Sequence, residues 1–152
     1  MKLPKYQLKG EKSLRVFEFI SEGHKGRIPK VIKYSKTNEK NVYNLAFGNK
    51  DITGDIDDLA VSNNRDSEKI LATVVSTIYA FTDKHPERMI FATGSTKART
   101  RLYRMGITKY IVEIKKDFEV LGFKEGNWHS FRKNVEYDAF LAIRKSFKNN
   151  TL

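Results

Sequence analysis

The chain has 152 residues, of which 39% are hydrophobic and 12% aromatic, enough apolar material for one packed domain, so wholesale disorder is excluded. It has no cysteine, which excludes disulfide frameworks, thiolate metal sites and a cysteine nucleophile. No apolar run approaches the ~20 residues of a membrane span, and the N-terminal stretch lacks the apolar region of a secretory signal. We therefore expect a cytoplasmic protein without a membrane partner.

The net charge of +11 is spread unevenly along the chain. Residues 1–50 carry +8, residues 51–88 carry −4 and residues 89–152 carry +7. A basic balance of this size attracts nucleic acid, phosphorylated ligands or acidic proteins through long-range fields. The alternative is a lysine-rich surface that only keeps a small protein soluble.

The first third of the chain has the composition of β-strands. Val, Phe and Ile are frequent in residues 13–21 and 27–36, and the glycines between these two segments suit a hairpin. Residues 41–48 alternate apolar and polar side chains, and a fourth strand is predicted over residues 55–62. We expect an antiparallel meander over residues 1–62.

Aromatic residues on these strands lie among several lysines. Strand aromatics next to basic residues can stack on single-stranded bases, but such side chains belong to the core far more often. The residues concerned are Phe17, Phe19, Tyr34, Tyr43 and Phe47.

Helical periodicity begins in the middle of the chain. Apolar side chains recur every three or four residues between positions 66 and 84, which predicts one amphipathic helix. Asp66 or Ser67 suits the start of this helix, and Pro86 marks its end.

Strands and helices are then predicted to alternate. A short buried strand over residues 88–93 precedes a helix that begins at Ser95 or Thr96 and ends at Gly106. The remaining elements are a helix, two strands and a disordered tail, over residues 108–117, 118–123, 136–146 and 147–152. Together the elements predict a single α+β domain over residues 1–152, with about three helices, a mostly antiparallel mixed sheet and an α/β half over residues 63–146.

The densest cluster of charge follows the strand-to-helix turn at Gly94, in the stretch IFATGSTKARTRLYRMGI. At 100° per residue, Lys97, Arg101 and Arg104 share one helix face, whereas Arg99 points to the other side, near Tyr103. A third face consists of apolar residues, which we expect to pack on the sheet: Ala98, Leu102 and Met105.

Basic residues at the start of a helix oppose the helix macrodipole, so this cluster does not serve helix stability. An anion on the free N–H groups of the Gly-Ser-Thr turn would relieve the conflict, because glycine permits close approach and the two hydroxyls can donate. The predicted ligand-binding residues are Gly94, Ser95, Thr96, Lys97, Arg99, Arg101 and Arg104. The alternative is a solvated helix whose cations pair with the acidic middle third.

Two other clusters are weaker candidates for chemistry. Asp51, Asp55, Asp57 and Asp58 do not match the spacing of a calcium loop, so we favour turn chemistry and expect no metal. The three histidines, His24, His85 and His129, lie far apart, and no G-x-S-x-G elbow accompanies them, which disfavours a hydrolase.

The stretch from residue 41 to residue 106 resembles a family of small bacterial proteins of unknown function; the motifs that carry the resemblance are SKTNEKNVYNLAFG, which starts at residue 35, and the basic stretch quoted above. The resemblance implies a bacterial single-domain protein without an established activity. The layout of residues 57–107 is also similar to the acetyl-CoA-dependent N-acetyltransferase superfamily (the GNAT fold). In that resemblance Ser95 to Ala98 match its N-x-x-A pattern, Gly106-Ile107 match its closing GF, and acetyl-CoA is the implied cofactor.

The chain departs from the acetyltransferase pattern in two places. Residues 65–70 read RDSEKI, without the glycines that let backbone N–H groups wrap a pyrophosphate, and the carboxylates of Asp66 and Glu68 would repel it. The position of the family's proton-donating tyrosine holds Leu102, and Tyr103, one residue later and about 100° away, is the candidate catalytic residue.

The leading hypothesis is that the protein binds an anionic, phosphate-bearing partner, nucleic acid first among them, without a cofactor. One alternative is a diverged acyl-CoA-dependent N-acyltransferase, in which catalysis is retained or lost. Another is a protein–protein module of a bacterial two-gene system with an acidic partner. The sequence leaves open whether the protein is an enzyme.

Overall fold

The computed structural model describes residues 4–57 and 64–150. These residues form nine strands and three helices, and the strands pair in a mostly antiparallel, mixed arrangement, so the predicted α+β class is confirmed. Residue contacts divide the chain into two compact units, Met1–Ser35 with Ala46–Phe81 and Lys36–Leu45 with Thr82–Leu152. This division differs from the predicted halves, because most of the first helix belongs to the first unit. No helix of the described residues is both long and apolar enough to cross a membrane.

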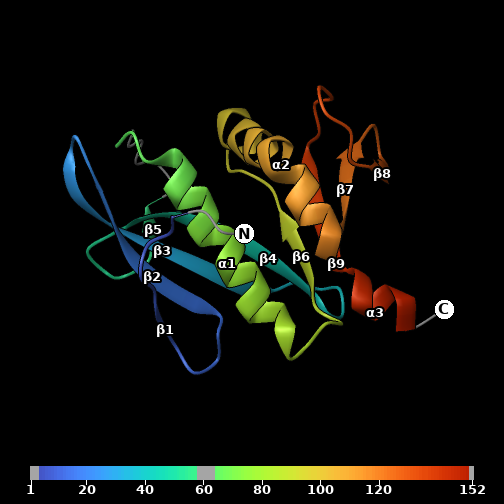
Figure 1. Cartoon of the computed structure of the whole chain (residues 1–152), viewed down its shortest axis with the longest axis horizontal. Helices are drawn as coiled ribbons and strands as arrows, with labels where there is room; N and C mark the ends of the chain where they lie inside the picture. Colours follow the sequence, from blue (N-terminus) through green and yellow to red (C-terminus); the bar gives the residue numbers. More distant parts are fainter. Residues whose placement is uncertain (1–3, 58–63, 151–152) are drawn as a thin grey trace. The chain divides into compact units, whose positions relative to one another are not determined.

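The strands of the first unit follow one another in chain order (Figure 1). Strand β2 (Val16–Gly23) forms a hairpin with β3 (Gly26–Lys36), in which Gly23 lies opposite Gly26. Strand β1 (Lys9–Gly10) pairs with the outer edge of β2. On the other side β3 neighbours β4 (Val42–Lys50), whose last residues pair with β5 (Ile56–Asp57).

Helix α1 (Ser67–Asp83) covers one face of these strands (Figure 1). The ring of Phe81 stacks on Tyr34 with centroids 4.2 Å apart, and the hydroxyl groups of Tyr34 and Thr77 are hydrogen-bonded at 2.8 Å. The helix matches the predicted span of residues 66–84 closely. Its most deeply buried residues include threonines, whose hydroxyls bond to the helix backbone and to tyrosine, so they satisfy the rule that buried polar groups are paired.

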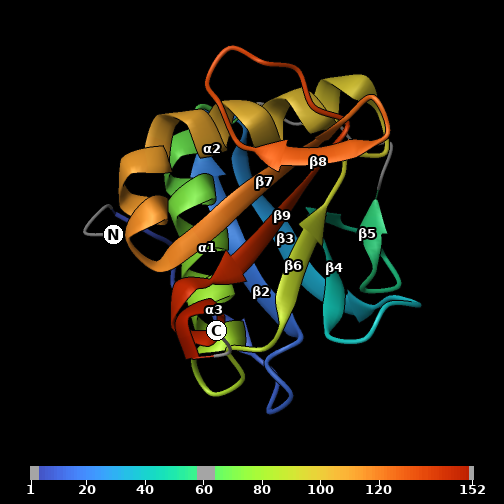
Figure 2. The same cartoon turned by 90° about the vertical axis from the view of Figure 1, so that its right-hand side faces the viewer.

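The second unit is a sheet in which the last strand of the chain lies in the middle (Figure 2). Strand β6 (Met89–Ala92) runs parallel to the first residues of β4. Strand β9 (Ala139–Arg144) lies between β6 and β7 (Phe118–Lys124), antiparallel to both. Strand β8 (Asn127–Ser130) forms the outer edge as a hairpin with β7.

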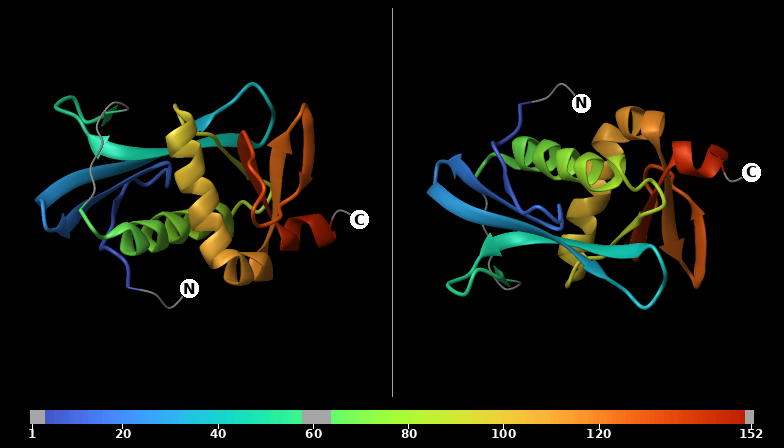
Figure 3. Two further views of the ribbon diagram at one scale, coloured as in Figure 1. Left: turned by 90° about the horizontal axis from the view of Figure 1, so that it is seen from above. Right: turned by 90° about the horizontal axis from the view of Figure 1, so that it is seen from below.

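Helix α2 (Lys97–Asp117) replaces the two helices predicted over residues 95–106 and 108–117. Gly106 does not end the helix, as predicted, but lies buried inside it, and the helix bends later, at Tyr110, where the backbone leaves helical geometry (Figure 3). An interior glycine costs about 1 kcal/mol relative to alanine and does not by itself stop a helix. Tertiary packing on this face therefore outweighs the local stop signal.

Other boundaries differ from the prediction at the edges of the sheet and at the end of the chain. The short edge strands β1 and β8 were not predicted. Part of the predicted disordered tail forms helix α3 (Lys145–Asn150). Of the strand predicted over residues 55–62, β5 is the part that the structure describes, since residues 58–63 lie outside the described residues.

Candidate functional site

The Gly-Ser-Thr turn connects β6 to α2 and folds back onto the start of the helix. The N–H of Gly94 donates to the Thr100 hydroxyl at 3.0 Å. A Cβ at Gly94 would lie 2.4 Å from the Thr100 nitrogen and 2.6 Å from Arg99 Cβ, closer than real atoms approach. Glycine is therefore required here by the close approach of the chain to its own helix. The prediction that its N–H is free for an anion is wrong, because the Thr100 hydroxyl accepts from it.

Thr96 is the N-cap of α2, in agreement with the prediction that Ser95 or Thr96 holds this position. Its hydroxyl accepts from the N–H of Arg99 at 3.2 Å. That bond occupies one of the two hydroxyls that were expected to face a ligand, whereas Ser95 is exposed. The first two helical N–H groups, of Lys97 and Ala98, have no acceptor within a helix and remain the backbone donors at this end.

The turn and the first two turns of α2 form one wall of a hollow of about 890 Å³. Lys97, Arg101 and Arg104 all line it, together with Gly94, Ser95 and Thr96. Arg99, the seventh residue predicted for the site, is not part of the lining and is half-buried on another side of the helix. The structure therefore brings six of the seven predicted residues to one concavity.

The opposite wall comes from the segment directly before β9, which the sequence predicted to be the start of a strand over residues 136–146 but which precedes the strand in the structure. Glu136, Tyr137 and Asp138 line the hollow there. The backbone of Asp138 is held on both sides, because its carbonyl accepts from the Thr93 hydroxyl and its N–H donates to the Phe123 carbonyl, each at 2.8 Å. Periodicity relates residues within one helix, and this segment follows α2 only after β7 and β8, which is why this wall was missed.

The apolar face predicted for α2 is wrong. Leu102 and Met105 are 59% and 55% exposed, and Ala98 is exposed as well, so all three line the hollow and none packs on the sheet. The buried residues of the helix are Gly106, Tyr110 and Ile111. The helix is thus turned so that its basic side chains and several apolar ones share one surface.

Charge in the hollow is mixed but positive. Three cationic residues, Lys97, Arg101 and Arg104, and two acidic residues, Glu136 and Asp138, line it. Arg104 is half-buried, and its Nη1 donates to the Val135 carbonyl at 3.5 Å, which ties the helix to the opposite segment. The first turn of α2 holds no acidic residue, so the cations are not balanced from within the helix.

Tyr103, the candidate catalytic residue of the acetyltransferase resemblance, is not among the residues that line the hollow. It is half-buried on the side of α2 away from Leu102. The one-residue displacement in the sequence thus corresponds to a different face of the helix in the structure.

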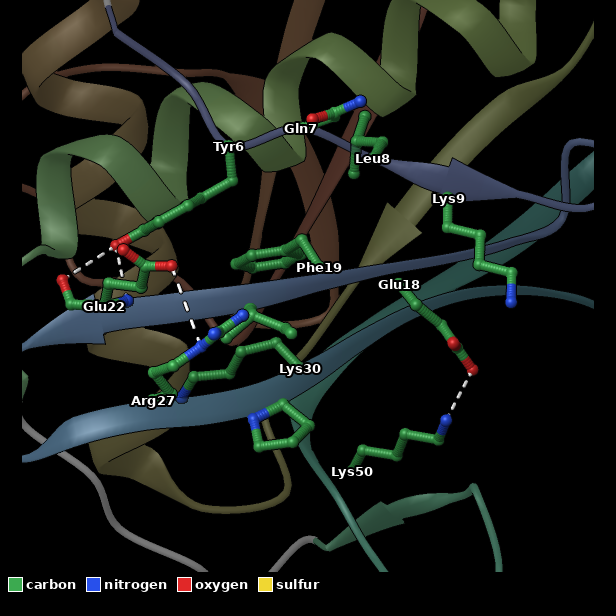
Figure 4. A pocket seen from close by; sticks show the side chains of 12 residues that line it. Tyr6, Gln7, Leu8, Lys9, Glu18, Phe19, Glu22, Arg27, Lys30 and Lys50 are labelled. Atoms are coloured by element: carbon green, nitrogen blue, oxygen red, sulfur yellow. Dashed lines mark hydrogen bonds and ion pairs between the residues drawn. The ribbon is translucent and has the colours of Figure 1, made fainter.

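A second hollow, of about 570 Å³, lies in the first unit, between residues 6–9 and the strands β2 and β3 (Figure 4). Most of its charged side chains have partners within the unit. Lys50 pairs with Glu18 at 2.9 Å, Arg27 with Glu22 at 3.8 Å, and the buried Lys30 donates to the amide oxygen of Asn49 at 2.5 Å. A hollow in which most cationic side chains are already paired offers less to an anionic ligand than the hollow at α2.

Several of the remaining candidates of the sequence have structural roles. Phe17, Phe19 and Tyr34 are buried, and Tyr34 contacts both Phe17 and helix α1, which assigns these three to the core and not to base stacking. The Asp51 carboxylate accepts from the N–H and hydroxyl of Thr53 and from the N–H of Asp55, as expected of turn chemistry. Asp55 in turn pairs with Lys33 at 2.6 Å, and so this part of the acidic third is engaged within the first unit.

Comparison with known proteins identifies a family and no closer relative. No curated protein and no solved structure shows significant similarity to the chain. A family model described as "Family of unknown function (DUF6934)" matches residues 2–145, which is nearly the whole chain and includes both units and the hollow at α2. The chain therefore belongs to this family of unknown function.

Proposed function

We propose that the protein binds an anionic, phosphate-bearing partner, nucleic acid first among them, at the hollow formed by the start of α2. The observation that carries this proposal is the convergence of Lys97, Arg101 and Arg104 on one concavity. Side chains of a merely solvated helix face would splay over a convex surface. A volume of about 890 Å³ lies within the range of ligand sites.

Guanidinium groups favour this function because each presents a planar fork of donors that matches a phosphate. The helix adds the N–H groups of its first turn and the positive end of its dipole. The net charge of +11 would speed the encounter with a polyanion and supply further contacts outside the hollow.

The proposal is tested by measuring the affinity for a fluorescently labelled oligonucleotide by anisotropy. The double variant Arg101→Glu with Arg104→Glu should bind at least about tenfold more weakly, because each lost phosphate contact removes a charge-assisted bond. Lys115→Glu with Lys116→Glu is the matched control, since it makes the same change in net charge on exposed positions at the far end of α2. If both variants lose the same affinity for the oligonucleotide, the loss is explained by net charge alone, which would contradict a binding site at the hollow.

A diverged N-acyltransferase is the second candidate, and the strand order favours it. Strands β4 and β6 are parallel with α1 between them in the chain, and β9 lies between β6 and β7. The acetyltransferase resemblance implies the same layout. In that layout a helix connects two parallel strands, and a second helix and a final antiparallel pair of strands follow. The missing glycines in residues 65–70 and the position of Tyr103 away from the hollow oppose the chemistry.

Thermal unfolding in the presence of acetyl-CoA distinguishes the acyltransferase function from binding of a nucleic acid. A ligand at 100 times its Kd stabilises a protein by about 2.7 kcal/mol, which raises the melting temperature measurably. We expect no rise at millimolar acetyl-CoA. A clear rise, abolished by Arg101→Glu, would move the assignment of the hollow to acyl-CoA binding.

A further inference from the structure

The hollow at α2 has an apolar component that phosphate binding does not explain. Leu102 and Met105 are 59% and 55% exposed, and they alternate along the helix with Lys97, Arg101 and Arg104, so cationic and apolar side chains line the same wall. Exposed large apolar side chains in a concavity mark a surface that a partner covers. A ligand made of phosphate alone would leave them in water.

Resting on the proposed function, we infer that the occupant of this hollow is single-stranded nucleic acid, with its phosphates on the basic side chains of α2 and an unpaired base against Leu102 and Met105. A base in a single strand exposes an apolar face next to a charged backbone, which is the combination that this wall offers. A duplex hides its base faces in the stack and presents mainly phosphates at its surface.

The acidic wall of the hollow supports the same occupant. Glu136 and Asp138 would repel a cluster of phosphates, but a carboxylate accepts readily from the exocyclic amino group of a base, as it does from cytosine N4. The backbone bonds of Asp138 to Thr93 and Phe123 hold this wall in place. An acidic protein segment would match the cations and the apolar side chains, but it would find like charges on the opposite wall.

The experiment compares two labelled DNA probes with the same number of phosphates, a single strand of about 12 nucleotides and a hairpin duplex, within the length of typical single-strand sites. The wild type should bind the single strand about tenfold more tightly, a difference of about 1.4 kcal/mol. Leu102→Ser with Met105→Ser should remove most of this preference, while the dependence of affinity on salt stays unchanged because no cation is lost. Circular dichroism confirms that each variant is folded.

Val112→Ser is the matched control for the apolar variant. Val112 is 69% exposed on the same helix, beyond the bend at Tyr110, and does not line the hollow. This substitution should leave the affinity for both probes unchanged. An equal loss in the control would show that the helix surface binds DNA nonspecifically and would overturn the inference.

The remaining outcomes separate the two proposals. Equal or tighter binding of the duplex, or full single-strand preference in Leu102→Ser with Met105→Ser, overturns the inference and leaves the proposed function standing. Absence of salt-sensitive binding to either probe overturns both. Displacement of the single strand by poly-glutamate as efficiently as by unlabelled strand would assign the hollow to an acidic polypeptide and also overturn the inference.

Discussion

At the scale of single residues, the turn before α2 depends on Gly94 for a reason that lies in the protein itself. Its Cα sits so close to Arg99 and Thr100 that no side chain fits, and its N–H is held by the Thr100 hydroxyl. The turn is thus a rigid support for the hollow. In the site that we propose, the turn would contribute mainly through the position it gives to α2 and less through donors of its own.

Gly94→Ala should therefore destabilise the protein by about 1–3 kcal/mol, because the helix start must shift to admit a methyl group. Urea unfolding of the two proteins measures the difference. Ser95→Ala is the control in the same turn; since Ser95 is exposed, its effect should stay within about 0.5 kcal/mol. A Gly94→Ala variant as stable as the wild type would show that the turn is not held as described.

Two carboxylates of the β4–β5 turn make stability depend on acid pH. The Thr53 hydroxyl lowers the pKa of Asp51, together with the N–H of Asp55, and the ammonium of Lys33 lowers the pKa of Asp55. A folded-state pKa below the unfolded value means stability that is present above the ordinary carboxyl pKa of about 3.9 and lost as pH falls through the folded pKa.

The wild type should therefore lose stability more steeply below about pH 4 than the variant Asp51→Asn with Asp55→Asn, in which these groups cannot titrate. Thermal unfolding between neutral pH and about pH 3 records the two profiles. The profiles should be separated at neutral pH and approach each other in acid. Parallel profiles over the whole range would mean that the two carboxylates do not titrate differently in the folded protein.

At the scale of elements, α1 and α2 show where sequence periodicity succeeds and where it fails. The apolar stripe of α1 spans the whole helix, and the predicted bounds agree with the structure within one residue at each end. For α2, the predicted helix ended at Gly106, so its buried face was predicted from the residues before Gly106 alone. Tyr110 and Ile111, beyond that stop, select the buried face and turn Leu102 and Met105 outward.

Two alanine substitutions test which face of α2 is buried. Ile111→Ala should cost about 2–4 kcal/mol, because it removes buried methyl groups and leaves a cavity. Leu102→Ala should change the free energy of unfolding by less than about 0.5 kcal/mol, since the side chain is largely in water. Urea unfolding of both variants gives the comparison, and the reverse order would restore the face predicted from the sequence.

At the scale of the whole molecule, the sequence predicted the α+β class, most of the elements and the hairpin of β2 and β3, but not the pairing of strands that lie far apart in the chain. The parallel pairing of β4 with β6 and the place of β9 between β6 and β7 join residues far apart in the chain. Such neighbours are chosen by packing over long separations and leave no local signal. The acidic wall of the hollow was missed for the same reason. Of the seven ligand-binding residues predicted at the basic wall, all but Arg99 line the hollow, but Ala98, Leu102 and Met105, which were predicted to pack on the sheet, line it as well.

The cations that line the hollow at α2 all come from the basic last part of the chain, residues 89–152. The family to which the chain belongs has no known function, so the assignment rests on the chemistry of that wall. An intracellular, bacterial setting stays a prediction from the sequence.

The central claim is tested most directly by the salt dependence of single-strand binding in the wild type and in Arg101→Glu with Arg104→Glu. Each phosphate contact contributes about 0.7 to the slope of log K against log salt, so the variant should show a slope shallower by about 1.4 along with weaker binding. Lys115→Glu with Lys116→Glu should keep the wild-type slope. Identical slopes in the wild type and the arginine variant would contradict phosphate binding at this hollow.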